Sequence, residues 1–329
     1  MLIETSAPTR IDLAGGTIDI WPLYLFHPGA QTLNAAISLR ARARVEPRTD
    51  HRIVIRSEDT DTTVEAEGWQ ELRGQPQLRL LSLLVHFFEA SGITLTTSCD
   101  SPAGAGIAGS SALNVAVCAA LAQWQRTHYE PEALLQIALN IEAQAIKVPT
   151  GLQDYRPALY GGIAALELDV DATRRVPLHV DFSELHQRSV LCYTGEPRNS
   201  GTNNWEITKK HIDGDRHIFD CFERIRDTAA AMRDALTRAD WDGVGRAIAE
   251  EWDNRKRLAP GVTTAAIDGL IARAMQAGAT AAKVCGAGGG GCLFCYGPPD
   301  RRDAMADALR AGGARVLDYR FEQHGLVRG

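Results

Sequence analysis

P-A-G-A-G-I-A-G-S-S-A-L, residues 102–113, combines a glycine-rich loop with the start of an apolar run. Gly104, Gly106 and Gly109 allow backbone turns with φ > 0 and a close approach to a ligand. Ser110 and Ser111 favour the first turn of a helix. Such a loop presents unpaired N–H groups at the positive end of the helix dipole, where phosphate binds well. The stretch therefore predicts a phosphate-binding loop, and the alternative is an ordinary turn between a strand and a helix.

Length and charge narrow the class of protein. The chain has 329 residues, more than a single hydrophobic core usually supports, so two domains are expected. Its formal net charge of -6 disfavours nucleic-acid binding, which needs a basic face. No apolar run reaches the roughly 18 residues of a membrane span, and residues 1–16 lack the pattern of a secretory signal. We therefore expect a cytoplasmic protein with no membrane or nucleic-acid partner.

Cysteine usage agrees with a reducing compartment. The seven cysteines are odd in number and irregularly spaced, which is typical of free thiols rather than of a disulfide framework. Cys292 and Cys295 form a C-x-x-C within an apolar run, and no second pair stands at the spacing of a zinc ribbon. We expect these two side chains to be buried as small hydrophobic groups, and a metal or redox role is the alternative.

The rest of the chain alternates between strand-like and helix-like patterns. Alternating or β-branched runs predict strands over residues 8–13, 31–48, 51–57, 93–99, 163–169, 189–194 and 314–323. Helical spacing predicts helices over residues 77–91, 112–125, 131–147, 214–238, 240–257, 264–276 and 302–311. Residues 59–76 are polar and are expected to form a surface connection. Both halves are therefore α/β or α+β, and the polar segment 170–188 separates the expected domains, 1–180 and 181–329.

Two further motifs accompany the glycine-rich loop. P-T-R-I-D-L-A-G-G-T-I-D occupies residues 8–19, and C-G-A-G-G-G-G-C occupies residues 285–292. In this order and at these separations, the three motifs resemble those of the GHMP kinases. The resemblance implies an α+β fold of two domains, the first similar to ribosomal protein S5 domain 2 and the second ferredoxin-like. It also implies that ATP binds in the cleft between them.

One branch of this family is the most similar. The turn A-G-G with Asp19, the run G-L-Q-D followed by A-L-Y-G-G, and the segments C-Y-T-G and K-V-C-G-A-G-G-G-G resemble the D-glycero-D-manno-heptose 7-phosphate kinases. That resemblance implies an ATP- and Mg²⁺-dependent kinase whose substrate is a sugar or a sugar phosphate. The best specific expectation is phosphorylation of the anomeric hydroxyl of the heptose 7-phosphate, by a monomer or a homodimer.

The resemblance assigns the ATP and metal sites. The residues expected to bind the nucleotide are Pro102, Gly104, Ala105, Gly106, Ala108, Gly109, Ser110 and Ser111. Because no Gly-Lys-Ser/Thr is present, this loop is not a Walker A motif. Mg²⁺ prefers hard oxygen ligands, and the expected ones are Ser110 and Glu142. Gly109 stands where most relatives carry a serine, so Ser111 remains a second candidate for the metal.

The catalytic pair follows from the same comparison. Asp154 is expected to accept the proton of the substrate hydroxyl, or to orient and polarise that hydroxyl. Arg10, in the first motif, is expected to keep Asp154 ionised and to stabilise charge on the transferred phosphoryl group. The alternatives are that Asp154 merely caps a loop and that Glu142 is an exposed carboxylate on a helix.

Sugar binding is expected at the turn after the first motif strand. A carboxylate at Asp19 would accept hydrogen bonds from sugar hydroxyls, and the residues expected to shape its surroundings are Gly15, Gly16, Thr17, Gly288 and Gly289. Arg156 stands where relatives have a different run, and it is expected either to bind an anionic group of the substrate or to form a structural salt bridge. Further candidates for that anion are Arg198, Lys209 and Lys210.

Three other functions remain open from the sequence. The first is a kinase of the same fold that acts on an unphosphorylated sugar or a uronic acid. The second is an ATP-dependent decarboxylase, since this fold also supports that lyase chemistry. The third is a sugar sensor without catalytic activity, which the presence of Arg10, Glu142 and Asp154 disfavours.

Overall fold

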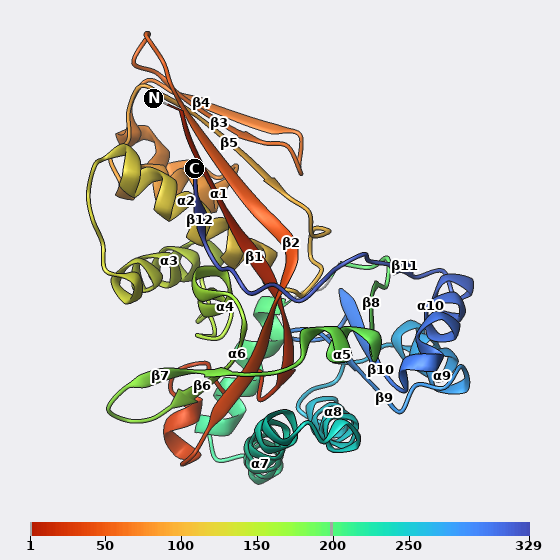
Figure 1. Cartoon of the computed structure of the whole chain (residues 1–329). Coiled ribbons are helices and arrows are strands. Elements are labelled where there is room, and N and C mark those ends of the chain that lie inside the picture. The colour runs from red at the N-terminus through yellow and green to blue at the C-terminus, as the bar shows by residue number, and fades with distance from the viewer. Residues whose placement is uncertain (1, 198–199) are drawn as a thin grey trace.

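Two β-sheets organise the structure. The computed structural model describes residues 2–197 and 200–329, with the side chains of all of these except 200–203. Within these residues the strands form one eight-stranded and one four-stranded sheet, and helices pack against both (Figure 1). None of the described helices is long and apolar enough to cross a membrane.

The larger sheet contains the first motif. Its main path runs β12-β1-β2-β5-β3-β4, while β6 pairs with β2 and β7 pairs with β6. The strands are β1 (Ile3–Ala14), β2 (Gln31–Pro47), β3 (Ile53–Ser57), β4 (Thr62–Ala66), β5 (Ile93–Cys99), β6 (Ile163–Leu168), β7 (Thr173–Leu178) and β12 (Val327–Arg328). All pairs are antiparallel except β3 with β5.

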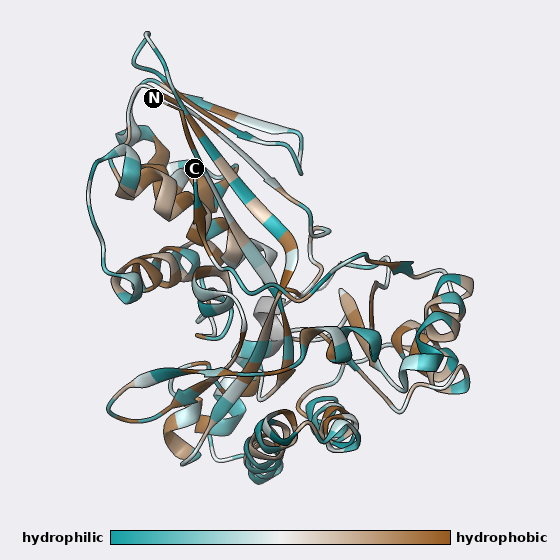
Figure 2. Ribbon diagram, viewed as in Figure 1, coloured by the Kyte–Doolittle hydropathy of each residue, from teal (hydrophilic) through white to brown (hydrophobic). Residues whose placement is uncertain are grey.

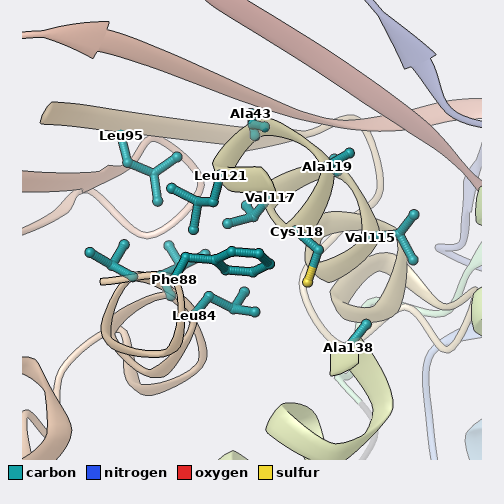
Figure 3. Packing of buried hydrophobic residues seen from close by; sticks show 14 of the residues in the cluster. Ala43, Leu84, Phe88, Leu95, Val115, Val117, Cys118, Ala119, Leu121 and Ala138 are labelled. Atoms are coloured by element: carbon teal, nitrogen blue, oxygen red, sulfur yellow. The ribbon is translucent and has the colours of Figure 1, made fainter. Parts of the chain in front are cut away.

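Four helices accompany this sheet. They are α1 (Arg79–Phe87), α2 (Gly109–Trp124), α3 (Pro131–Ile146) and α4 (Tyr155–Tyr160), and the short turns η1 (Leu23–Phe26) and η2 (Trp69–Gly74) lie in the same half. Helix α2 packs on β1 and β2 and also against α1 and α3. A helix enclosed in this way must be apolar almost all round, which explains why α2 is brown along most of its length in Figure 2. Figure 3 shows Leu84 and Phe88 facing Val117 and Leu121 in this core.

The smaller sheet belongs to the second half. Its order is β11-β8-β10-β9, with β8 (Ser189–Tyr193), β9 (Ala281–Val284), β10 (Cys292–Tyr296) and β11 (Arg315–Val316). The helices of this half are α5 (Phe182–Gln187), α6 (Ser200–Ile212), α7 (Arg216–Arg238), α8 (Trp241–Arg255), α9 (Ala265–Gln276) and α10 (Arg302–Ala311), with the turn η3 (Pro299–Arg301). Asp240 caps α8 by accepting a hydrogen bond from Gly243 N at 2.9 Å.

The two halves share a hydrophobic core. One buried cluster contains Ile11 and Leu33 from the larger sheet together with Leu191 and Phe294 from the smaller sheet and Met232 from α7. The first motif strand therefore contacts both halves of the molecule. The expected boundary at residue 180 falls between β7 and α5 and stays a prediction.

The cysteines lie where apolar side chains are needed. Cys292 and Cys295 are fully buried on β10, as expected for small hydrophobic groups. No disulfide joins any two of the seven cysteines, all of which lie in the described ranges.

Several expected elements differ from the structure. Residues 59–76 are not a simple connection, because β4 adds an edge strand and η2 follows it. The expected strand 314–323 is reduced to β11, after which the chain returns to the larger sheet through the bridge between Ile37 and Phe321 and through β12. The short helix α4 and the helix α6 were not expected. These segments are short or carry little amphipathic pattern, so tertiary contacts determine their structure.

Candidate active site

The predicted catalytic residues converge on one pocket at the junction of the two halves. Its lining includes Arg10, Thr17, Asp19, Ser110, Ser111, Glu142, Gly151, Gln153, Asp154, Asn204, Arg255, Gly286 and Ala287. These residues come from β1 and the turn after it, from the first turn of α2, from α3 and the loop that follows it, and from α6, α8 and the loop after β9. A larger hollow lies over the outer face of the eight-stranded sheet, and no residue of the predicted site lines it.

The glycine-rich loop leads into α2 in the way its sequence predicts. Gly104 and Gly106 take φ values of +69° and +77°, in the region that favours glycine. The helix begins at Gly109 without a side-chain cap, and the first helical N–H to reach a carbonyl is that of Ala112, which donates to Ala108. The preceding N–H groups of the first turn are thus available to an anion.

Backbone contacts hold this loop against both halves. Arg10 N donates to Ile107 O at 3.0 Å, and Cys292 N donates to Ala105 O at 2.7 Å. Of the predicted ATP-binding residues, Ser110 and Ser111 line the pocket. The residues that form the loop and the helix start beside it are Pro102, Gly104, Ala105, Gly106, Ala108 and Gly109.

Glu142 lies directly beneath the first turn of α2. Its carboxylate accepts hydrogen bonds from Ser110 Oγ at 2.8 Å, Ser111 Oγ at 3.1 Å and Tyr155 Oη at 2.7 Å. The residue is buried, and burial raises the pKa of its carboxyl group. Among the described residues no cation forms an ion pair with it.

A buried carboxylate that faces hydroxyl groups and has no cationic partner fits Mg²⁺. The part of the chain that the structure describes has no cluster of three or more histidine, cysteine or acidic side chains suited to a metal. Mg²⁺ needs few protein ligands, because it keeps several waters and takes further oxygens from nucleotide phosphates.

Arg10 and Asp154 form a charged pair at the centre of the pocket. Nε and Nη2 of Arg10 both donate to Asp154 Oδ1, at 3.1 Å and 2.5 Å, and Nη1 donates to Gly106 O at 3.0 Å. Burial opposes the charge on Arg10, but Asp154 and Asp12 outweigh it and raise the pKa of the guanidinium. The arginine therefore stays charged and links the phosphate-binding loop to the carboxylate.

Asp19 is buried beside this pair. Its Oδ2 accepts a hydrogen bond from Gln153 N at 2.9 Å, while its Oδ1 has no partner among the residues that the structure describes. Burial, followed by repulsion from Asp154, raises the pKa of Asp19 to about 6. Gly15 has φ +81°, and a Cβ there would lie 2.1 Å from Gln31 O, so the turn that presents Asp19 requires glycine.

Its neighbours complete the turn. Thr17 has φ +76° and lines the pocket. A Cβ on Gly16 would lie 2.0 Å from Nη2 of Arg255. The turn therefore packs directly on α8, which belongs to the second half of the chain.

Sequence reasoning missed a cluster of buried charges behind the pocket. Asp12 Oδ2 lies 3.1 Å from Lys283 Nζ and 3.5 Å from Arg255 Nη2, and Arg255 Nη2 lies 3.0 Å from Glu251 Oε1. All four side chains are at most 2% exposed. Burial opposes ionisation of Asp12, but the positive charges of Lys283, Arg255 and Arg10 outweigh it and lower its pKa to about 2.

This cluster connects the two halves of the chain, and one of its members forms part of the pocket lining. Asp12 lies on β1, Glu251 and Arg255 on α8, and Lys283 on β9. Arg255 Nη1 also donates to Gly286 O at 2.5 Å, and Arg255 lines the pocket. A charged lysine within the apolar run A-A-K-V was the one signal in the sequence that could have indicated it.

Five predicted substrate residues do not line the pocket: Gly15 and Gly16, which form the turn that presents Asp19, and Arg156, Gly288 and Gly289. Arg156 donates instead to Glu132 Oε2 and Thr173 Oγ1, both at 2.8 Å, so the salt-bridge alternative describes it and the anion site does not. Gly288 and Gly289 pack against Val262, to which Gly289 N donates at 2.8 Å, and the pocket is lined by Gly286 and Ala287 instead. The glycine loop bends away because its later residues must reach β10.

The other anion candidates also give no support to an anion site. Lys209 and Lys210 are exposed on α6 and do not line the pocket. Arg198 lies outside the described residues.

Comparison with protein families agrees with this geometry. The family description "GHMP kinases N terminal domain" matches residues 78–162, and "GHMP kinases C terminal" matches residues 232–315. The chain belongs to the GHMP kinases. The prediction of a two-domain α+β fold of this family is confirmed, and as a GHMP kinase the protein uses ATP as its phosphoryl donor.

Individual relatives of this GHMP kinase are similar over their whole length. The D-glycero-alpha-D-manno-heptose 7-phosphate kinase of Campylobacter jejuni is 29% identical over 98% of either chain. A solved D-glycero-D-manno-heptose 1-phosphate kinase from Bacteroides thetaiotaomicron has 25% identity and a TM-score of 0.81, covering 99% of this chain and 98% of that one. Galactokinase of Lactococcus lactis shares the fold, with 18% identity, a TM-score of 0.81 and coverage of 99% and 95%.

Proposed function

We propose that this ATP-dependent sugar kinase transfers the γ-phosphoryl group of ATP to the anomeric hydroxyl of D-glycero-D-manno-heptose 7-phosphate. The observation that carries the transfer chemistry is the pairing of Arg10 with Asp154 beside the first turn of α2. The identity of the substrate is inferred from the heptose phosphate kinases to which the chain is similar. The cytoplasmic location and the monomeric or homodimeric state stay predictions.

The nucleotide phosphates would bind at the start of α2. Loop N–H groups and the helix dipole attract the triphosphate, while Ser110 and Glu142, with Ser111 beside them, would hold Mg²⁺. When bound, Mg²⁺ neutralises charge on the β- and γ-phosphates. The positive charge also relieves the unfavourable burial of the Glu142 carboxylate, which pairs with no cation in the described chain.

Asp154 would act on the acceptor hydroxyl. Arg10 occupies Oδ1, which leaves Oδ2 to accept the hydroxyl hydrogen bond and then the proton. As the substrate oxygen bonds to the γ-phosphorus, the bond from that phosphorus to the bridging oxygen of ADP breaks. Arg10 lies next to the forming charge and would stabilise it.

Asp19 would select the sugar. Its unpartnered Oδ1 can accept hydrogen bonds from sugar hydroxyl groups. Because Arg156 is engaged in a salt bridge, it does not explain recognition of the 7-phosphate. An unphosphorylated sugar or a uronic acid is therefore the alternative substrate that the test must include.

The test is a screen for ADP release with ATP and Mg²⁺ over heptose 7-phosphate, hexoses, fucose and uronic acids. We expect the highest kcat/KM for heptose 7-phosphate and, by phosphorus NMR, a product phosphorylated at the anomeric carbon. Higher kcat/KM for another sugar would overturn the substrate assignment. Release of CO₂ with ATP turnover would indicate a decarboxylase, and the absence of any phosphorylated product at every Mg²⁺ concentration would indicate a sugar sensor.

A further inference from the structure

A small cavity lies behind the loop that carries Asp154. It is lined by residues that include Asn34 on β2, Gln153 in the loop, Arg156 on α4, Leu166 on β6 and Arg175 on β7. Gln153 also lines the active-site pocket, so this residue separates the two spaces. The cavity has room for about one water molecule.

Three buried polar atoms on residues that line this cavity have no hydrogen-bond partner within the described part of the chain. They are Asn34 Oδ1, Gln153 Oε1 and Arg156 Nε, and their residues are only 4%, 6% and 8% exposed. In two of these side chains the other polar atoms are occupied, since Asn34 Nδ2 donates to Thr32 Oγ1, Arg156 Nη1 donates to Leu152 O and Arg156 Nη2 donates to Glu132 and Thr173. A buried polar atom that is left unpaired destabilises the fold, so three around one cavity indicate a shared ligand.

The chemistry of the three atoms selects that ligand. Arg156 Nε donates one hydrogen bond, and the two amide oxygens accept two. The guanidinium charge disfavours a cation, and the amide oxygens of Asn34 and Gln153 disfavour an anion. A water molecule accepts one hydrogen bond and donates two, and it needs two to four polar partners to remain buried.

We propose that this cavity binds one water molecule, which connects Arg156, Gln153 and Asn34 and fixes the loop that carries the catalytic carboxylate. Gln153 N already donates to Asp19, and Asp154 follows directly in the chain. Through the water, the position of this loop depends on α4 and on β2. Gln153 and Arg156 are thus positioning residues for Asp19 and Asp154. This inference rests on the roles proposed above for those two carboxylates.

The binding half of the proposal is tested by a high-resolution crystal structure of the unmodified protein. We expect a water within about 2.7–3.2 Å of all three atoms. An empty cavity, or direct pairing among the three side chains, would overturn the proposal. This measurement needs no substrate, so it remains informative if heptose 7-phosphate is not the substrate.

The positioning half is tested by the variant Gln153→Met, which keeps the length of the side chain and removes the acceptor. We expect kcat with the sugar to fall about ten- to hundred-fold, because a small displacement of a catalytic group has an effect of this order, while KM for ATP stays within about two-fold. The matched control is Arg175→Lys, which alters a cavity-lining arginine whose guanidinium already donates to Gly161 O at 2.7 Å.

The control is expected to keep kcat within about two-fold. Equal kcat values for Gln153→Met and the unmodified protein would overturn the positioning role, as would equal losses in Gln153→Met and Arg175→Lys. If no sugar is phosphorylated by the unmodified protein, the proposed function fails, and the crystallographic result alone decides whether the water site exists.

Discussion

Arg10 and Asp154 are 144 residues apart in sequence, and two nitrogens of the arginine donate to a single carboxylate oxygen. The arginine is buried, whereas the aspartate side chain is 21% exposed and faces the pocket. This asymmetry fixes one oxygen of Asp154 and leaves the other accessible to a substrate. The same arginine also holds Gly106 O in the phosphate-binding loop, so one side chain sets the position of the carboxylate relative to the nucleotide site.

Replacement of the proposed proton acceptor tests its role. We expect Asp154→Asn to lower kcat by roughly two orders of magnitude or more, as for a positioned acid–base group, and to leave ATP binding nearly unchanged. Steady-state ADP release and calorimetric titration with a nucleotide measure the two quantities. Turnover close to that of the unmodified protein would exclude Asp154 from the chemical step.

The variant Glu142→Gln is expected to weaken Mg²⁺ binding and, without metal, to stabilise the fold. The amide keeps the shape of the carboxylate but not its charge, so we expect the Mg²⁺ concentration for half-maximal activity to rise at least about ten-fold. Burial raises the pKa of Glu142 in the folded state, so ionisation at neutral pH destabilises the protein without metal.

We therefore expect Glu142→Gln to raise the unfolding midpoint at pH 7 in the absence of Mg²⁺, and the gain to shrink as the pH falls toward 4. Chelator-treated samples followed by circular dichroism provide the measurement. A lower midpoint at pH 7, with unchanged Mg²⁺ dependence, would contradict both the electrostatic argument and the metal assignment.

The titration of Asp19 should make kcat/KM for the sugar depend on pH. Its pKa of about 6 means that the carboxylate loses its charge below pH 6. If sugar hydroxyls donate to the ionised form, kcat/KM for the sugar falls about ten-fold per pH unit below that value. Asp19→Asn is expected to remove this inflection and to lower kcat/KM at pH 8, and an inflection that persists in the variant would assign it to another group.

Ionisation of Asp19 favours use of the sugar but lowers the stability of the folded protein. Because its folded-state pKa is raised, its contribution to stability is fully present below about pH 4 and is lost as the pH rises through 6. Asp19→Asn should therefore stabilise the protein more at pH 8 than at pH 4.5, which denaturant unfolding at the two pH values measures. A larger gain at the lower pH would contradict this assignment.

Lys283 tests the buried charge cluster. Removal of one partner leaves Asp12 and Glu251 buried beside fewer positive charges, and we expect Lys283→Met to cost about 3–5 kcal/mol of unfolding free energy. The control is Lys256→Met, which breaks an exposed ion pair with Asp253 and should cost less than about 1 kcal/mol. Urea unfolding compares the two, and similar small losses would show that the cluster contributes little.

Substitution of Gly109 tests whether the start of α2 tolerates a side chain at this position. A Cβ there would meet Ser101 Oγ at 3.4 Å, which is an ordinary contact, so Gly109→Ala should be tolerated and stabilise the protein by about 0.4–1 kcal/mol. Gly104→Ala is the matched comparison, because its φ of +69° strains any other residue. We expect KM for ATP to rise only in the second variant, and a rise in both would show that Gly109 itself is needed.

Much of the fold follows from local sequence patterns. The helices α3, α7, α8 and α9 appear within one or two residues of their predicted bounds, because apolar spacing and caps such as Asp240 act locally. By contrast, β4 and the tail that ends in β12 have weak patterns of their own. They become strands only because an edge of the larger sheet offers unpaired backbone groups.

The candidate site also contains residues that the sequence predicted and residues whose role only the structure shows. Arg10, Asp19, Glu142 and Asp154 were predicted because the motifs around them resemble those of the family, and the structure brings all four to one pocket. Arg156 was ambiguous, since an arginine beside a catalytic loop can serve a ligand or a neighbouring carboxylate. Its salt bridge with Glu132 depends on how α3 and α4 pack, which no local pattern expresses.

Sequence patterns alone indicated the family, most of the longer helices and strands, and the chemical types gathered at the site. These depend on short-range properties, namely backbone freedom at glycine, helix periodicity and the charge of individual side chains. Only the tertiary structure decided that Asp12, Glu251, Arg255 and Lys283 form one buried cluster and that Arg156 turns away from the pocket. Buried charges require partners from distant parts of the chain, and which partners meet is settled only when the sheets and helices pack.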